Sequence, residues 1–354
     1  MSTVVIAMSG GVDSSIAAAL LKEQGHNVIG MMMRLWSETG QESFNRCCTP
    51  EAMALARQVA GILDIPFYAI DAQDIFFDNV VQNFIQGYTQ GITPNPCLEC
   101  NRQIRWGFLL KHALSLGADY LATGHYVRKK TLHSNEHQLL RGIDPTKDQS
   151  YVLHVLNQNQ LSKAIFPLGD YSKSSVREIS KQLKLPISER SESQDLCFLA
   201  GGDYRNFLLR HSTDTIESGP ILDLNGQVIG DHAGIPFYTI GQRKGLGISS
   251  NQPLYVIEKD IGRNALIVGN TSELERLELT TTSTNWIAGR SPESSFKATI
   301  KIRYRAKESS GIITPIGNNK VHIRFNMPHI GITPGQAAVF YNGDVCLGGG
   351  IIEQ

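Results

Sequence analysis

Apolar and polar positions divide the first half of the chain into two kinds of segment. Longer stretches carry apolar residues at helical spacing and begin near Ser15, at Pro50 and at about Asp74. Between them lie short, continuous apolar runs typical of buried strands, at residues 3–8, 27–35, 66–70 and 118–126. Strands that alternate with helices predict an α/β fold with a doubly wound parallel sheet and a ligand site at the carboxyl ends of the strands.

The pattern changes beyond about residue 212. Gly, Pro and Asn recur at short intervals between alternating apolar and polar runs, as in small antiparallel barrels. We therefore predict a catalytic domain over residues 1–212 and two small, mostly antiparallel β domains over 213–280 and 281–354. Within the first domain, the polar segment 131–141 predicts a hairpin or an exposed loop.

One segment of the last domain, residues 296–307, alternates strictly between apolar and polar residues. A strand there would place five basic residues among the six on one face. These six are Lys297, Thr299, Lys301, Arg303, Arg305 and Lys307. We interpret the face as a surface for a phosphate backbone, although an edge strand guarded by lysines has the same pattern.

Composition narrows the function classes. The 354 residues are 41% hydrophobic, and 33 basic residues balance 33 acidic ones, so any nucleic-acid site must be a local patch. The chain has no apolar run long enough to cross a bilayer and no leader pattern at its start, so we expect a cytoplasmic protein without membrane contact. Six cysteines are too few for a disulfide scaffold of this size. We take a monomer as the default.

The first strand runs into Ser9-Gly10-Gly11-Val12-Asp13-Ser14-Ser15 and then into a helix. Two glycines allow close backbone approach to a ligand, and the start of a helix favours an anion. The lysine-bearing phosphate loop and the G-x-G-x-x-G motif are both absent here. What remains resembles the pyrophosphate-binding loop of the ATP pyrophosphatase superfamily, and the alternative is an ordinary Gly-Gly turn with a serine cap.

Two cysteines follow the proline-rich stretch Thr93-Pro94-Asn95-Pro96. Cys97 and Cys100 fall at or near the start of a predicted helix, which lowers the pKa of a thiol. Half of a structural zinc site is the alternative, but the chain offers no second close pair with this Cys-x-x-Cys spacing. Cys197 is a single thiol far from this pair in the sequence. Cys346 follows a tight turn, and we expect it to be buried and inert. We assign no role to Cys47 and Cys48.

His125 and Lys147 are further candidates for binding. His125 ends a predicted strand at the same rim as the glycine turn and precedes a basic run, so we favour contact with a nucleotide or base over a structural histidine. Lys147 precedes a predicted helix, where a phosphate would fit, although it could simply be solvated. Met33, near the end of the second strand, is a candidate to touch an adenine.

Together these motifs closely resemble the tRNA-specific 2-thiouridylase family over nearly the whole chain. The matching segments are residues 9–15, the Thr-Pro-Asn-Pro stretch through Asn101, 124–126, 147–151, 194–198, 241–247 and 303–305. The resemblance implies that ATP, with Mg²⁺, adenylates the C2 oxygen of the wobble uridine in tRNAs for Lys, Glu and Gln. It also implies that sulfur then replaces this oxygen.

The resemblance also implies roles for two cysteines. Cys197 would carry a persulfide loaded by a cysteine desulfurase or a sulfur carrier, and Cys100 would be its nucleophilic partner. Cys100 would either release hydrosulfide or close a disulfide with Cys197, which is the chemistry of thiol–disulfide exchange.

The remaining site residues are carried over from the family motifs. The nucleotide would be bound by Ala7, Met8, Ser9, Gly10, Gly11, Val12, Asp13, Ser14, Met33 and Gly124. The RNA would be bound by Asn95, Pro96, Cys97, His125, Lys147, Asp148, Gln149, Arg303, Tyr304 and Gln336.

Cys97 stands where many relatives carry Asp, so no carboxylate base can act there. Three thiols could instead hold an iron–sulfur cluster with one open iron. Two other function classes stay open: another adenylating synthetase of the superfamily, and an RNA-binding protein without catalysis. AMP release that depends on ammonia or an amino acid would favour the first, and no ATP turnover on adding tRNA would favour the second.

Overall fold

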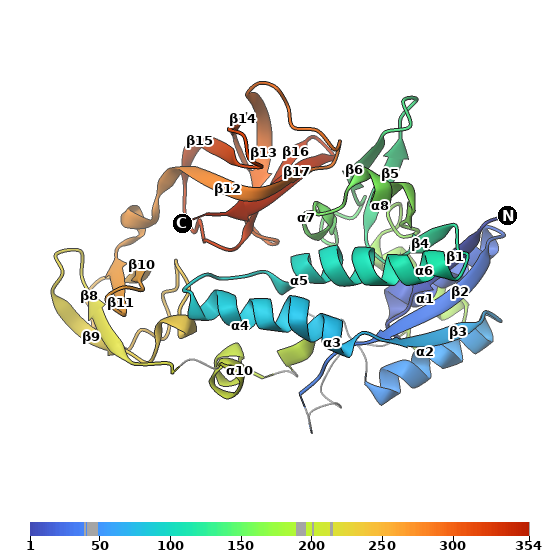
Figure 1. The fold of residues 1–354 in the computed structure, drawn as a ribbon, viewed down its shortest axis with the longest axis horizontal. Helices are drawn as coiled ribbons and strands as arrows, with labels where there is room; N and C mark the ends of the chain where they lie inside the picture. Colours follow the sequence, from blue (N-terminus) through green and yellow to red (C-terminus); the bar gives the residue numbers. More distant parts are fainter. Residues whose placement is uncertain (39, 41–48, 189–195, 200–201, 213–214, 354) are drawn as a thin grey trace.

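The computed structural model describes residues 1–38, 40, 49–188, 196–199, 202–212 and 215–353, and Figure 1 shows their arrangement. Cys47, Cys48, Gln194 and Asp195 lie outside these residues. The predicted domain boundary after residue 212 also falls beside undescribed residues, at 213–214. Among the helices of the described part, none is long and apolar enough to cross a membrane.

A parallel sheet forms the first unit, as the sequence predicts. Its strand order is β3-β2-β1-β4-β7, and every pair is parallel. The strands are β1 (Thr3–Ala7), β2 (Asn27–Arg34), β3 (Phe67–Asp71), β4 (Tyr120–Ala122) and β7 (Ala164–Ile165). Val4, Val5 and Ile6 are completely buried because helices cover both faces of β1.

The two faces of this sheet carry different helices. Helices α1 (Val12–Glu23), α2 (Pro50–Ile62) and α9 (Lys173–Gln182) share one apolar core with one face. Helices α6 (Leu110–Ser115) and α8 (Gln158–Ser162) share the core on the other. The doubly wound arrangement predicted from the sequence is therefore confirmed.

Two long helices lie side by side beyond the sheet (Figure 1). The first joins α3 (Gln73–Phe76), a π-helical turn at Phe77–Val81 and α4 (Gln82–Thr89). The second joins α5 (Pro96–Glu99), a π-helical segment at Cys100–Leu109 and α6.

Strand β4 is shorter than the predicted 118–126. It ends at Ala122, and the following residues turn over the start of α1. A Cβ on Gly124 would lie 2.9 Å from both the Asp13 carbonyl carbon and the Ser14 nitrogen. This close packing takes the chain out of the sheet and brings it to the glycine turn.

The second unit is a four-stranded sheet in the order β10-β11-β8-β9. Its strands are β8 (Gly219–Leu222), β9 (Val228–His232), β10 (Tyr255–Asp260) and β11 (Ala265–Gly269). Its core is continuous with the long helix that ends in α4 and with α10 (Tyr204–His211). The short helical turns at Cys197–Leu199 and Ile235–Phe237 border the same core.

The third unit is a barrel. Six antiparallel strands follow the order β12-β15-β14-β13-β16-β17, and a pairing of β12 with β17 closes them. They are β12 (Arg276–Trp286), β13 (Phe296–Lys301), β14 (Ser309–Pro315), β15 (Val321–His329), β16 (Ala337–Asn342) and β17 (Val345–Ile352). A short helical turn at Thr271–Leu274 precedes it. Strand β12 crosses the boundary predicted at residues 280 and 281.

The hairpin predicted at 131–141 pairs with a strand of the barrel, which the sequence did not indicate. Strands β5 (Val127–Thr131) and β6 (His137–Arg141) form it, and β6 pairs with β17 of the barrel. The hairpin leaves the parallel sheet and adds two strands to the third unit, between the two in Figure 1. It therefore joins the first unit to the barrel.

The predicted strand at 296–307 is wrong in its second half. Strand β13 ends at Lys301, and residues 302–306 form bends and turns. Ala298, Ile300 and Ile302 are buried as predicted, but Tyr304 is exposed. The six polar residues between 297 and 307 thus do not form one continuous basic face, because the backbone turns after Lys301.

Candidate functional site

The glycine turn lies between β1 and α1, as predicted. Gly10 has a φ of +67°, and a Cβ there would lie 2.3 Å from the Ala52 carbonyl oxygen, so only glycine fits without a shift. The Ser9 backbone N–H donates to Ser14 Oγ at 3.2 Å, and Ser15 Oγ donates to the Gly11 carbonyl at 2.9 Å. The turn is thus shaped by its own serines and ends at the N-terminus of α1, where unpaired N–H groups favour an anion.

Asp13 lies in the first turn of α1 and receives two donors. The Tyr126 hydroxyl donates to Asp13 Oδ1 at 2.7 Å, and Lys173 Nζ lies 2.6 Å from the same oxygen. Neither Tyr126 nor Lys173 was predicted from the sequence to act at this turn. The distance of both residues from Asp13 along the chain hides this cluster until the fold is known.

The other predicted nucleotide residues surround this turn. Met8 is buried, and its backbone N–H donates to the Met31 carbonyl at 2.8 Å. Met33 is partly buried on β2 and packs against two cores, one on a face of the parallel sheet and one shared with the second unit. Gly124 lies against Asp13 and Ser14, as described above. The structure therefore brings the strand ends and the turn to one rim, and nucleotide contact stays a prediction.

Cys97 and Cys100 lie at the start of the second long helix. Asn95 caps it, because its side chain accepts from the Cys97 N–H at 3.2 Å, and Pro96 supplies a first-turn proline. Cys97 is exposed in the first turn, and Cys100 is partly buried one turn later. Asn101 is buried, donates to the Cys97 carbonyl at 3.1 Å and, among the described residues, leaves its Oδ1 without a partner.

Cys197 begins a short helical turn and is partly buried. Cys100 and Cys197 both border the core shared by the long helix ending in α4 and the second unit. The neighbouring Phe198 fixes this turn, since its ring lies 5.1 Å from that of Phe84 and 5.4 Å from that of Phe207. Two thiols far apart in sequence thus line the same part of the molecule.

The three thiols do not gather into a metal site. Within the described ranges, no three His, Cys, Asp or Glu side chains are placed to hold a metal ion. Cys97, Cys100 and Cys197 all belong to those ranges, so this arrangement does not fit an iron–sulfur cluster. The fourth described thiol, Cys346, is buried as predicted, and burial raises its pKa to about 12.

His125 is buried rather than open to a ligand. Arg105 Nη1 donates to its Nε2 at 3.1 Å, so its Nδ1 carries the proton and donates to Thr123 Oγ1 at 2.7 Å. Burial, and then the Arg105 charge, lower the pKa of His125 well below its ordinary value. A base could reach this neutral imidazole only if the surrounding side chains moved, and its role in RNA binding stays a prediction.

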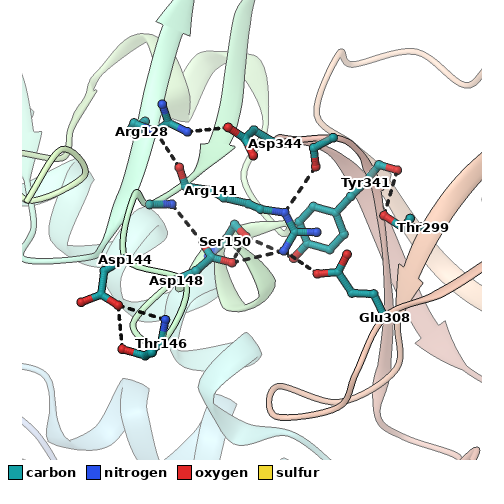
Figure 2. A network of polar contacts seen from close by, with 12 residues as sticks. Arg128, Arg141, Asp144, Thr146, Asp148, Ser150, Thr299, Glu308, Tyr341 and Asp344 are labelled. Carbon is teal, nitrogen blue, oxygen red and sulfur yellow. Dashed lines mark hydrogen bonds and ion pairs between the residues drawn. The ribbon is translucent and has the colours of Figure 1, made fainter. Parts of the chain in front are cut away.

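Asp148 and Gln149 hold the scaffold together. The Gln149 side chain accepts from the Tyr126 N–H at 2.9 Å, and the Gln149 N–H donates to the Tyr126 carbonyl at 3.1 Å. Asp148 is buried and accepts from the Ser150 hydroxyl at 2.8 Å, while Arg141 lies 3.6 Å away (Figure 2). Lys147 is partly exposed beside them.

Arg141 connects this network to the barrel (Figure 2). Its guanidinium lies 3.6 Å from the centre of the Tyr341 ring and 2.7 Å from Glu308 Oε1. The Tyr341 hydroxyl lies 3.1 Å from Ser150 Oγ, and burial raises its pKa well above the ordinary value. Contact of Asp148 or Gln149 with RNA stays a prediction, since both side chains already bind within the protein.

The predicted RNA residues of the barrel meet the helix that carries Cys100. Gln336 Nε2 donates to the Thr93 carbonyl at 2.9 Å, and the Thr93 N–H donates to the Pro334 carbonyl at 3.0 Å. Arg303 bonds Thr333 Oγ1 and donates to the Ile240 carbonyl at 3.4 Å, and burial lowers its pKa. Loops of all three units therefore converge beside Asn95.

Tyr151 lies at the centre of this convergence. Its hydroxyl donates to the Ala337 carbonyl at 3.0 Å and also bonds the Asn95 side chain. Burial raises the pKa of Tyr151, and its ring lies 6.1 Å from that of the exposed Tyr304. Tyr151 lies within one of the matching sequence motifs, but no role was predicted for it.

Comparisons with known proteins agree with this arrangement. Three family models match in chain order: a tRNA methyl transferase HUP domain at residues 2–201, a PRC-barrel domain at 205–270 and an aminomethyltransferase beta-barrel domain at 276–352. The tRNA-specific 2-thiouridylase MnmA 2 of Thermoanaerobacter sp. (strain X514) is 48% identical over 99% of this chain and 98% of its own. The chain belongs to the tRNA-specific 2-thiouridylase family.

A second family member, from Roseiflexus castenholzii (strain DSM 13941 / HLO8), is 46% identical over the full length of both chains. Among solved structures, a 4-thiouridine synthetase–RNA complex with bound ATP covers 59% of this chain and 50% of its own, at a TM-score of 0.37 and 15% identity. The 2-thiouridylase family resemblance stated from the motifs is confirmed by the full-length relatives.

Proposed function

We propose that this chain uses ATP to convert C2 of the wobble uridine in tRNAs for Lys, Glu and Gln from a carbonyl to a thiocarbonyl. The observation that carries the proposal is the full-length identity of 48% with a tRNA-specific 2-thiouridylase. The glycine turn would bind the phosphates of ATP, and Cys100 and Cys197, which border one core, would transfer the sulfur. Since tRNA and ATP are cytoplasmic reactants, we propose a cytoplasmic enzyme that acts as a monomer.

In the first step, the uridine C2 oxygen attacks the α-phosphorus of ATP and pyrophosphate leaves. The turn at residues 9–15 would hold the phosphates, with Gly10 and Gly11 allowing close approach and the N-terminus of α1 favouring their charge. Asp13 is the carboxylate at this turn, and Mg²⁺ often uses one or two carboxylates together with substrate phosphates. Bound there, Mg²⁺ would neutralise part of the phosphate charge.

In the second step, the outer sulfur of a Cys197 persulfide attacks C2 and AMP leaves. The Cys100 thiolate then attacks the inner sulfur, which forms a Cys100–Cys197 disulfide and leaves the outer sulfur on the base. If Cys100 acts first, hydrosulfide is released and attacks C2 instead. Both routes end in the same disulfide, which an external dithiol must reduce, and the persulfide comes from a cysteine desulfurase or a sulfur carrier.

The RNA site that we propose lies where the three units converge. Asn95, Pro96 and Cys97 would receive the flipped uridine, and unstacking a base costs little in a loop. Arg303, Tyr304 and Gln336 would hold the anticodon loop together with Lys147. The exposed ring of Tyr304 can stack on a base, and exposed Cys97 is then part of the pocket wall.

The test is thiolation of an unmodified tRNA-Glu transcript with ATP, Mg²⁺, cysteine and a desulfurase. Cys100→Ser and Cys197→Ser should abolish 2-thiouridine, measured by mass spectrometry of nucleosides. Cys97→Ser is the matched control and should retain most of the activity. If all three variants are inactive and activity follows bound iron, a cluster mechanism replaces this one.

A further inference from the structure

A lysine lies at the glycine turn and has no role in the chemistry described so far. Lys173 is the first residue of α9, and its Nζ lies 2.6 Å from Asp13 Oδ1. Only 11% of its side chain is exposed, whereas the other lysine on these two helices with a described ion pair, Lys22, is 43% exposed. A cation is therefore held beside the first turn of α1.

Three contacts fix the position of Lys173. Its backbone N–H donates to Asp144 Oδ2 at 3.0 Å, and Ser172 caps the helix behind it. Its ammonium lies 5.8 Å from the centre of the Tyr126 ring and bonds Asp13. Asp144 is itself held in an Asx turn by Thr146, so the loop before α7 (Ser150–Leu153) orients this lysine.

The ammonium faces the place where the phosphates of a nucleotide would lie. Asp13 is the second residue of α1, and the helix begins at the end of the glycine turn. An anion bound here would be surrounded by hydrogen-bond donors from three places. These are the glycine turn, the start of α1 and the Lys173 ammonium on α9. Cations fixed in advance stabilise the negative charge that grows on a leaving group.

We infer that Lys173 binds the triphosphate of ATP and stabilises pyrophosphate as it leaves. This inference rests on the proposed function. As the uridine oxygen bonds to the α-phosphorus, the bond from that phosphorus to the bridging oxygen breaks and its electron pair passes to pyrophosphate. Lys173 keeps its proton and neutralises part of this charge, and Asp13 holds the ammonium in place before the nucleotide binds.

A purely structural ion pair between α1 and α9 is the competing explanation. It predicts that loss of the Lys173 charge lowers stability and leaves phosphate chemistry unchanged. Lys22 provides a matched control, because it lies in the last turn of α1 and its Nζ is 3.6 Å from Asp64 Oδ2. Lys22→Gln removes a lysine that is paired with an aspartate, as Lys173 is, but at the opposite end of α1.

The first measurement is binding of inorganic pyrophosphate by calorimetry to the full chain, with thermal unfolding as the check on folding. Lys173→Gln should weaken binding about tenfold or more, as expected for loss of a hydrogen bond to a charged group. Its rate of AMP formation with tRNA should fall about 100-fold, while Lys173→Arg recovers a large part. Lys22→Gln should match the wild type. A folded Lys173→Gln chain with unchanged affinity and rate would overturn the inference.

A second measurement covers the case in which Lys173→Gln does not fold. Wild-type protein is acetylated with and without pyrophosphate, and the modified lysines are identified by mass spectrometry. Pyrophosphate should protect Lys173 and leave Lys22 unprotected, and equal acetylation of Lys173 in both samples would contradict the inference. Neither pyrophosphate measurement uses RNA, so failure of tRNA thiolation and failure of this inference are separate results.

Discussion

At the scale of single residues, the shape of the glycine turn at residues 9–15 depends on two glycines whose positions leave no room for a side chain. Gly10 has a positive φ and lies against α2, and Gly124 lies against the first turn of α1. Both positions exclude a Cβ because backbone atoms, which cannot rotate away, occupy the space. These glycines bring the ends of β1 and β4 and the starts of α1 and α2 to the same small region.

Gly124→Ala tests this contact. The added Cβ would lie 2.9 Å from the Asp13 carbonyl carbon and the Ser14 nitrogen, so the glycine turn must shift. We expect kcat/KM for ATP to fall about 100-fold, as small misplacements of reacting groups commonly do. Gly61→Ala, within α2, is the control, because nothing lies within 4 Å of its Cβ position. Equal kinetics for Gly124→Ala and wild type would show that the contact does not shape the site.

At the scale of helices and strands, the sequence predicted what depends on local pattern. The strand–turn–helix at the start, the long helices and the helix that begins after the prolines at 94 and 96 all have local signals in glycine, proline and apolar spacing. The strand predicted at 296–307 failed because alternation continues past Lys301 while the backbone turns. The alternation of apolar and polar residues indicates which side chains face a core, but it does not show that the backbone is a strand. Ile302 is buried although it lies after the end of β13.

Contacts between distant elements had no local signal. The pairing of β6 with β17, the Lys173–Asp13 ion pair and the Tyr126–Asp13 hydrogen bond all join segments that are far apart in the sequence. The burial of His125 and Asp148 was also hidden, because a polar residue near a strand end can face either solvent or a neighbouring unit. The motifs identified candidate residues, but they did not show which of these side chains form hydrogen bonds inside the protein instead of facing a ligand.

At the scale of the whole molecule, the hairpin β5–β6 joins the first unit to the barrel, and two of its arginines contact barrel residues (Figure 2). Arg141 is only 16% exposed and lies 3.6 Å from the ring centre of the barrel residue Tyr341, which is completely buried. It also lies 3.6 Å from Asp148 of the first unit, which is 4% exposed. Arg128 pairs at 2.8 Å with Asp344, which is 63% exposed. The first contact is therefore buried and the second is mostly at the surface.

Arg141→Ala and Arg128→Ala form a matched pair on this hairpin. Arg141→Ala leaves Asp148 buried without its cation, so we expect the free energy of unfolding to fall by about 3 kcal/mol. Arg128→Ala should cost about 1 kcal/mol or less, because its partner is solvated. Urea unfolding at neutral pH measures both. Similar losses in the two variants would contradict a buried connection between the units.

Activation of the C2 oxygen of the wobble uridine by ATP is the step on which the proposed function depends. The most direct measurement uses a tRNA-Glu transcript that carries ¹⁸O at C2 of this uridine, with ATP and a persulfide source. We predict that the label leaves the RNA and appears in the released AMP, in step with 2-thiouridine formation. AMP without the label, while 2-thiouridine forms, would contradict this mechanism.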